Sequence, residues 1–589
     1  MSWSFLITHQ LLHFLPSLNS FFLKKIYFIG NFFLSYEVYL THFLEGFVDA
    51  FDPLLLLDFI KKNLLLSFPT RFFARALFLL LTYNTMDRIS ANQSIMHNAY
   101  GIPVNIFANE QVKVEQAAIE ELSNLLDLQQ TIDDIQRLHP DFFAADARLH
   151  QVSITPDFHK GKGIPIGTTM LTEGFIAPQA IGKDVNCGMR LLLTDLSEDA
   201  IRAALPKLMQ AIRYVYFEGG RQIPLTPKQK QALLRHGLIG LLETHQETNN
   251  TGIWKYYNAE QQESDLSAVM DMGSMMTDGI FEGLDNYIKQ TYTSFDSQIG
   301  SIGGGNHFVE VQRVNKIHNG AIAHAWGIKE GMVSIMIHTG SVSVGYPTAS
   351  YFVDILRDLY PKDLRHPKNG IFPLPFSEQY QAYWDNFWMA LNNAANFAFG
   401  NRLFLGLMMQ RVLTDQFGEF TSQLLYDSGH NMLWKEELDG KTMFVHRKGA
   451  CSARGPEQLQ GTPFQWTGEP VLIPGSMGAA SFIMAGKGCK ESLFSTSHGA
   501  GRSLSRGDSL KVDDALFEEF MRQFNIVTPI DPNAFNIKGR KDILQKWKEE
   551  IKKEAPFAFK DIGPVIETQT SSGMADIVAE LEPVFTVKG

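Results

Sequence analysis

The sequence predicts an α+β fold, with one large domain over residues 86–589 and a hydrophobic extension over residues 1–85. Apolar residues at helical spacing recur in several stretches, and short apolar runs broken by glycine predict strands elsewhere. Helices and strands do not alternate regularly along the chain, so a doubly wound parallel sheet is not expected. We therefore expect mixed strands surrounded by helices.

Residues 1–85 differ in composition from the rest of the chain: they hold 15 of the 44 phenylalanines but only two of the 47 glycines. Lys24 and Lys25 follow the first apolar run, whereas a signal peptide carries its positive charge before that run. Polar residues also interrupt the roughly 20 apolar positions that a membrane span needs. We expect a segment outside the functional fold, with Met86 as a candidate start; a membrane anchor and an accessory helical segment are the alternatives.

The elements of the main domain are expected in a definite order. They are a helix over 110–136; strands over 151–155, 164–167, 180–182 and 189–194; polar helices over 198–290 with a surface insertion around 246–265; strands over 308–314 and 333–338; a long helix over 377–415; and, beyond 442, short strands and glycine turns up to a last helix near 542–554.

Charge and cysteine usage limit the functional classes. The formal net charge of −11 excludes a generally basic nucleic-acid-binding coat, so any contact with nucleic acid must be a local patch. The three cysteines, Cys187, Cys451 and Cys489, are too few for a disulfide framework. They fit a reducing compartment, and we expect a cytoplasmic protein.

Five glycine-flanked phrases carry side chains that can bind metals or phosphates. They are Asp184-Val-Asn-Cys187-Gly, Gly303-Gly-Gly-Asn306-His307, Ile337-His338-Thr-Gly-Ser341, Gly429-His430-Asn431 and Ser497-His498-Gly-Ala-Gly501. Each histidine taken singly is more often structural than functional. Together, His, Cys and Asp in such turns form the ligand set of a borderline divalent ion. A thiolate can bridge two metals, so the set is typical of a two-metal phosphoryl-transfer site.

These phrases, in this order, resemble the RtcB family of RNA ligases. The same holds for Pro156-Asp157-Phe-His159-Lys-Gly161, Arg447-Lys448-Gly449-Ala450, Pro474-Gly475-Ser476-Met477-Gly478 and Lys588-Gly589, so the resemblance runs from about residue 90 to the end. It implies a ligase of RNA repair or tRNA splicing that uses GTP and two Mn²⁺ ions per active site. Such ligases join an RNA 3′-phosphate or 2′,3′-cyclic phosphate to a 5′-hydroxyl through a guanylylated histidine.

The resemblance also implies roles for individual residues. His498 would be the nucleophile, and Asp157 lies in a motif that the family requires for activity. Cys187 would bridge the metals, Asp184 and His307 would complete one metal, and His338 and His430 the other. The guanylate contacts would be Asn306, Phe308, Glu310, His430, Asn431, Pro474, Gly475, Ser476, Met477, Ser481, Gly499, Ala500, Gly501 and Lys588.

One departure and two alternatives remain. Val342 and Ser343 stand where the family has Arg-Gly, which puts a phosphate contact in doubt and suggests a divergent branch. A metal-dependent RNA phosphodiesterase or cyclic-phosphate hydrolase would need the same ligands but not His498. A non-catalytic RNA-end-binding paralogue would be expected to lose the nucleophile or a ligand, and none is lost.

RNA ends are the expected partner, no membrane partner is expected for residues 86–589, and the sequence leaves open whether an archease-like activator takes part. Despite the acidic total, a basic track should lead RNA to the metal site, because RNA binding requires phosphate neutralisation. Its candidate residues are Lys160, Lys162, Arg190, Arg447, Lys448, Arg502 and Arg506.

Overall fold

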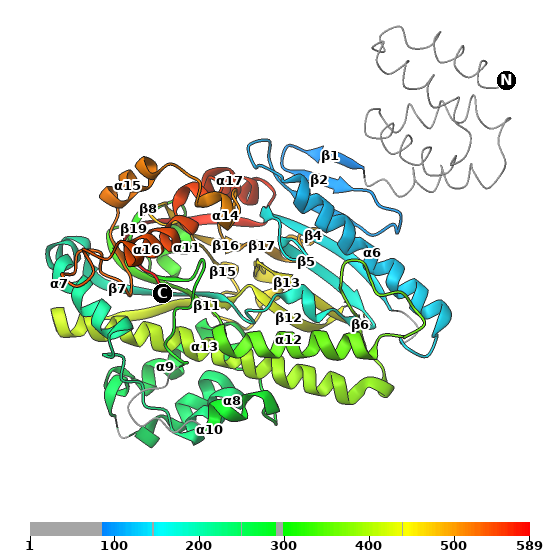
Figure 1. Ribbon diagram of the computed structural model, residues 1–589, viewed down its shortest axis with the longest axis horizontal. Coiled ribbons are helices and arrows are strands. Elements are labelled where there is room, and N and C mark those ends of the chain that lie inside the picture. Colours follow the sequence, from blue (N-terminus) through cyan, green and yellow to red (C-terminus); the bar gives the residue numbers. More distant parts are fainter. Residues whose placement is uncertain (1–84, 144–146, 249, 290–297, 439) are drawn as a thin grey trace, which may run out of the picture. The chain divides into compact units, whose positions relative to one another are not determined.

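The computed structural model describes residues 85–143, 147–248, 250–289, 298–438 and 440–589 (Figure 1). Apart from Thr85, the predicted extension of residues 1–85 lies outside the described residues. Two large sheets and the helices around them make up the described part of the chain. The predicted α+β class is confirmed.

The central sheet carries most of the site and runs in the order β11-β7-β9-β8-β19-β16-β15, with β18 added beside β19. All its pairs are antiparallel except β18 with β19. Its strands are β7 (Gly188–Ser197), β8 (Phe308–Ile317), β9 (Met332–Thr339), β11 (Ser422–Gly429), β15 (Pro470–Ile473), β16 (Ser481–Gly486), β18 (Ile526–Val527) and β19 (Ala575–Val587).

The second sheet has seven strands in the order β1-β2-β3-β4-β5-β13-β12, antiparallel except for β3 with β4. These strands are β1 (Met86–Ser90), β2 (Gln93–Met96), β3 (Val104–Phe107), β4 (Arg148–His159), β5 (Ile166–Glu173), β12 (Asn431–Leu438) and β13 (Lys441–Lys448). Two short antiparallel pairs complete the strands: β6 (Phe175–Ile176) with β10 (Leu374–Pro375), and β14 (Ala450–Ser452) with β17 (Ser495–Ser497).

Helices surround the sheets (Figure 1). The α-helices are α6 (Gln116–Leu138), α7 (Glu198–Phe217), α8 (Pro227–Thr244), α9 (Ala259–Asp265), α10 (Asp285–Lys289), α11 (Gly320–Ala325), α12 (Val342–Leu359), α13 (Gln381–Phe417), α14 (Arg506–Ser509), α15 (Asp514–Gln523), α16 (Lys541–Lys553) and α17 (Ile562–Ser571). The 3₁₀ helices are η1 (Pro178–Ile181), η2 (His245–Thr248), η3 (Gly252–Tyr256), η4 (Leu266–Ala268), η5 (Met270–Gly273), η6 (Glu282–Leu284), η7 (Glu378–Tyr380), η8 (Pro456–Leu459) and η9 (Pro556–Ala558).

The long helix α13 packs against β7 and β9 and against α7, α8 and α12. Its buried asparagines tie loops to the helix. Asn393 accepts a hydrogen bond of 2.8 Å from the backbone N–H of Phe281. Asn401 accepts one of 3.0 Å from the N–H of Ser301 and donates one of 2.9 Å to its carbonyl. Buried backbone groups outside regular structure need such partners, so these amides fix the loop that leads to Gly303.

No described helix combines the length and apolar character that a membrane span requires. This holds even for α13, in which polar and charged side chains interrupt the apolar ones.

Most predicted elements lie where the sequence placed them. The helix over 110–136 is α6, the strands over 151–155, 189–194, 308–314 and 333–338 belong to β4, β7, β8 and β9, and the helix over 377–415 is α13. The strand over 164–167 is only partly confirmed, because β5 begins at Ile166.

Three expectations about elements were wrong. The predicted strand over 180–182 is the end of η1 and a glycine turn, because Pro178 at the first helical position sets a helical φ. The segment 246–265 is not merely a surface insertion: Trp254 is buried, with its ring 5.3 Å from that of Phe404. The helix near 542–554 is α16, and it is not the last element, since α17 and the 13-residue strand β19 follow.

Candidate functional site

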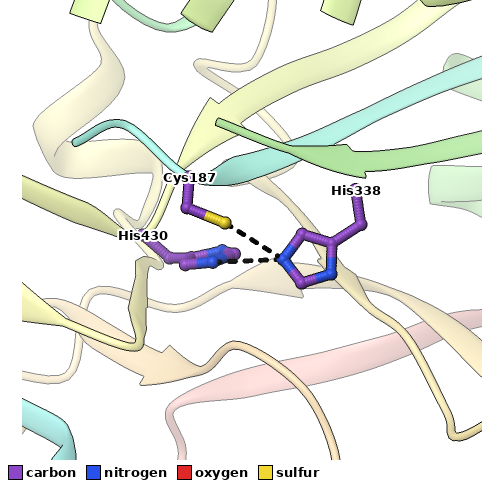
Figure 2. A group of neighbouring side chains, drawn as sticks. All are labelled: Cys187, His338 and His430. Carbon is purple, nitrogen blue, oxygen red and sulfur yellow. Dashed lines mark hydrogen bonds between the residues drawn. The ribbon is translucent and has the colours of Figure 1, made fainter. Parts of the chain in front are cut away.

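Three of the predicted metal ligands face one another in a buried cluster. The Sγ atom of Cys187 lies 3.3 Å from Nε2 of His338. That nitrogen lies 3.4 Å from Nε2 of His430. Figure 2 shows the thiol and the two imidazoles pointing toward one another from separate strands and turns. All three side chains are buried.

A second triad shares the same sulfur. Sγ of Cys187 lies 3.2 Å from Nε2 of His307, and Oδ2 of Asp184 lies 2.9 Å from that nitrogen. In each triad the candidate ligand atoms lie within 4.8 Å of one another. Two ligand sets with one common thiol are the arrangement that a pair of bridged metals requires.

The central sheet explains why these distant residues meet. Cys187 comes directly before β7, and His430 directly after its neighbour β11, where Gly188 and Gly429 are paired. His338 lies near the end of β9, and His307 directly precedes β8. Because β11, β7, β9 and β8 are consecutive and antiparallel, these four positions meet at one end of the sheet.

The hydrogen bonds of the outer ring nitrogens fit a metal site. Nδ1 of His307 lies 3.0 Å from the carbonyl of Ile302, and Nδ1 of His338 lies 3.2 Å from the carbonyl of Asn306. A carbonyl can only accept, so each Nδ1 carries the proton and each Nε2 of the neutral ring presents a lone pair. Oδ2 of Asp184 has no hydrogen-bond donor among the described residues. The lone pairs therefore converge on a space suited to cations.

Burial acts on the protonation states in the same direction. It lowers the pKa of His338, as do the neighbouring His430 and His307, and it lowers the pKa of His430, so both rings are neutral. Burial and the charge of Asp184 raise the pKa of the Cys187 thiol well above its ordinary value. Its thiolate would be stabilised there by a bound cation. The donor set therefore fits two divalent ions.

His498 is held by a buried carboxylate. Its Nδ1 lies 2.5 Å from Oδ2 of Asp157, and its backbone N–H donates to the same oxygen at 3.2 Å. The hydroxyl of Thr155 donates to the other oxygen at 2.6 Å. Burial raises the pKa of Asp157, but His498 and these hydrogen bonds outweigh burial, so the pKa is lowered and the group is ionised. Nδ1 therefore carries a proton, and Nε2 is the nucleophilic nitrogen.

The turn after His498 depends on Gly501. Its φ is +74°, and a Cβ there would lie 2.1 Å from the carbonyl oxygen of Asp157. Only glycine allows this close approach between the turn and β4. The His498 ring centroid lies 4.9 Å from that of His430, so the candidate nucleophile adjoins the metal-ligand set.

All five predicted metal ligands and His498 line one cavity of about 1050 Å³. Most of the predicted guanylate residues line it as well: Asn306, Phe308, Asn431, Pro474, Gly475, Ser476, Met477, Gly499, Ala500, Gly501 and Lys588. Glu310 and Ser481 lie outside the lining set. They are joined by Gln312, whose Nε2 donates to Glu310 at 2.8 Å and to Ser481 at 3.0 Å.

Five of the seven residues of the predicted basic track line the cavity: Lys160, Lys162, Lys448, Arg502 and Arg506. Arg190 and Arg447 do not, and their assignment was wrong. Arg190 is buried and pairs with Asp427 at 3.0 Å. Arg447 is buried and donates to Ser495 at 2.9 Å. Both satisfy internal acceptors, a role that their glycine-flanked phrases do not reveal.

The cavity also contains residues that the sequence analysis did not single out. Glu554 pairs with both Arg502 and Arg506, so it offsets part of their positive charge. Gln179 lies five positions before Asp184, and the proximity of this polar residue to a ligand motif is the signal that could have identified it. Val342, the departure from the family pattern, lines the cavity at φ +39° and donates its N–H to Asp184 at 2.9 Å. It therefore retains a ligand contact but supplies no guanidinium.

Known proteins share this arrangement of motifs. A family profile described as tRNA-splicing ligase RtcB matches residues 144–589. The chain is 32% identical over 457 residues to the tRNA-splicing ligase RtcB of Thermococcus kodakarensis, covering 74% of this chain and 87% of the relative. It is 31% identical over 465 residues to the protein of the same name from Pyrobaculum aerophilum, and 32% identical over 457 residues to that of Nanoarchaeum equitans, with the same coverages. This chain belongs to the tRNA-splicing ligase RtcB family.

Proposed function

We propose that the protein is an RNA ligase that joins a 3′-phosphate or 2′,3′-cyclic phosphate end to a 5′-hydroxyl end, with GTP as the activating nucleotide, in RNA repair or tRNA splicing. One observation carries the proposal: an Asp157-oriented His498 adjoins two metal-ligand triads that share Cys187, all in one cavity. A hydrolase would need the triads alone. A binding protein would need neither an ionised Asp157 nor an oriented imidazole.

His498 would carry the guanylyl group. Its Nε2 attacks the α-phosphorus of GTP, a nitrogen–phosphorus bond forms, and the bond to the bridging oxygen breaks so that pyrophosphate leaves. Asp157 holds the Nδ1 proton and stabilises the positive ring throughout. An oxygen of the RNA 3′-phosphate then takes GMP from His498. The RNA 5′-hydroxyl finally attacks the 3′-phosphorus, and GMP leaves; a cyclic end must first take up water to give the 3′-phosphate.

Asp184, Cys187 and His307 would hold one metal, and Cys187, His338 and His430 the other. When bound, the two ions would neutralise phosphate charge and align the attacking and leaving oxygens. A thiolate by itself favours Zn²⁺, so the choice of Mn²⁺ rests on membership of the family rather than on ligand softness.

The guanylate would lie against the cavity-lining residues predicted for it. The backbone amides around Gly499 and Gly501 and the ammonium of Lys588 offer donors to phosphate oxygens. Burial lowers the pKa of Lys588 to about 8, so it still carries most of its charge at neutral pH. Glu310 and Ser481 would act through the hydrogen-bonded group formed with Gln312.

The decisive experiment uses GTP labelled in its α-phosphate. With Mn²⁺, the full-length protein should acquire one acid-labile label, and unlabelled RNA with a 3′-phosphate should discharge it. Joining of a 3′-phosphate RNA to a 5′-hydroxyl RNA should then be assayed with and without an archease-like activator. A protein that cleaves cyclic phosphate ends without acquiring label would refute the ligase proposal.

A further inference from the structure

Gln179 lines the cavity with an amide that nothing satisfies. Its Oε1 and Nε2 are both buried, and neither has a hydrogen-bond partner among the described residues. Buried side-chain amides are nearly always hydrogen-bonded, because an unpaired donor and acceptor destabilise the folded state. An unpaired amide beside a cavity is therefore best explained by a ligand that supplies both partners.

The surroundings of Gln179 are apolar. It belongs to η1, and α12 packs against this short helix. The α12 residues that line the cavity are Val342, Ala349 and Val353, and each is half-buried. One polar amide next to an apolar wall is typical of sites that bind flat organic groups, since the wall packs against the ring face and the amide fixes its orientation.

This subsite adjoins the metal-ligand set. The backbone N–H of Val342 donates to Oδ1 of Asp184 at 2.9 Å, so the start of α12 contacts a predicted ligand directly. Gln179 precedes that ligand by five residues and is followed by Gly182, which also lines the cavity. A group bound between η1 and α12 therefore lies next to the phosphate that the metals would hold.

We propose that Gln179 and the apolar face of α12 bind the base of a nucleotide at one of the RNA ends being joined, and that Gln179 reads the edge of that base. A carboxamide presents one donor and one acceptor in a single plane, which matches a nucleobase edge such as N6 and N7 of adenine. A phosphate would need cations or N–H donors, which the side chains of Val342, Ala349 and Val353 do not offer. This inference rests on the proposed function, because it takes RNA as the substrate.

The test compares Gln179→Leu and Gln179→Glu with Gln151→Leu as a matched control. Gln151 is also half-buried but lies outside the cavity set, and its Nε2 donates to the carbonyl of Glu491 at 3.0 Å. Binding of short 3′-phosphate and 5′-hydroxyl oligonucleotides, each with every one of the four terminal bases, is measured without GTP. Joining of the same RNAs is then measured in competition.

The wild type should prefer one terminal base by about tenfold, the discrimination of a single amide–base pair. Gln179→Leu should abolish that preference, Gln179→Glu should change which base is preferred, and Gln151→Leu should retain it. The thermal midpoint of Gln179→Leu should not fall, since no hydrogen bond within the protein is lost. A general collapse of the cavity would instead lower both the midpoint and the yield of the GMP adduct.

Equal binding of all four terminal bases at both ends by the wild type, or an unaltered preference in both Gln179 variants, would overturn the inference. The binding assay does not depend on ligation. A wild-type protein that forms no GMP adduct would therefore refute the proposed function, while the base preference would still decide the role of Gln179.

Discussion

His498 and Asp157 form a contact of 2.5 Å between Nδ1 and Oδ2, and the backbone N–H of His498 donates to the same oxygen. Asp157 is fully buried, and its second oxygen is occupied by Thr155. The carboxylate can therefore do little other than fix the ring orientation and place the proton on Nδ1. Which nitrogen attacks is thus decided by β4, far from the turn that carries the imidazole in the sequence.

Replacing Asp157 by Asn should disable the imidazole without removing it. The Asn amide can donate to Nδ1, which would place the ring proton on Nε2 and leave no lone pair for attack. The rate of GMP-adduct formation should fall by about 10²–10⁴, as expected when an orienting carboxylate is lost. Bound metal should stay near two per chain by elemental analysis. A rate within threefold of wild type would contradict the tautomer argument.

His498→Ala and Cys187→Ser should fail for different reasons. His498→Ala should form no adduct yet bind metal nearly as well as wild type, because His498 belongs to neither triad. It should still seal RNA that already carries a 3′-guanylyl cap. Cys187→Ser removes the atom common to both triads and should lose metal as well as activity. Adduct formation by His498→Ala, or full metal occupancy in Cys187→Ser, would count against the assignments.

The cavity lysines and the buried arginines should give opposite results on substitution. Lys160→Glu with Lys162→Glu should weaken RNA binding and reduce its salt dependence, because each phosphate contact releases counterions. The fold should be unaffected. Arg190→Met should instead lower the free energy of unfolding by about 2 kcal/mol, since it leaves buried Asp427 with only Arg402 as partner. Titration at several salt concentrations and urea denaturation check the two outcomes.

The site could be predicted from the sequence where residue type alone carries the chemistry. Cys187 and the four histidines sit in glycine-flanked phrases, and their side chains suit only a few roles. Their convergence could not be derived, because it depends on the adjacency of β11, β7, β9 and β8, which no local pattern encodes. Within similar phrases, Lys162 faces the cavity and Arg447 an internal hydroxyl; this difference is one of burial, and it appears only once the chain is folded.

The missed elements have physical causes as well. In β19, Glu580, Glu582 and Pro583 interrupt the apolar alternation, and the register shifts at both places. Such bulges hide a strand from a period-two search. The unpaired amide of Gln179 is equally invisible in the sequence, where it is an ordinary polar residue.

A chain that begins at Met86 should fold and retain adduct formation. β1 begins at Met86, so such a chain keeps every described strand and helix, and the family profile starts later still, at residue 144. The expected result is an unchanged thermal midpoint and adduct yield relative to the full-length protein. Aggregation or loss of activity on this truncation would show that residues 1–85 contribute to the fold.

Glu310 should make stability depend on pH. Burial raises its pKa to about 7, against the lowering effect of hydrogen bonds from Thr586 and Gln312. A carboxyl whose folded-state pKa exceeds its unfolded value near 4.5 disfavours folding once it ionises. Its contribution therefore falls as pH rises from about 4.5 to about 7 and is constant above that. The shift corresponds to roughly 3 kcal/mol at most.

Glu310→Gln should remove this dependence. The variant should gain about 2 kcal/mol of unfolding free energy over wild type between pH 5 and pH 8, measured by urea denaturation at both values. Its amide can still bond with Thr586 and Gln312, so packing is preserved. If the carboxylate contacts the guanylate, the more stable variant should bind GTP more weakly. A stability difference independent of pH would show that Glu310 ionises normally, and the destabilising charge would then need no functional explanation.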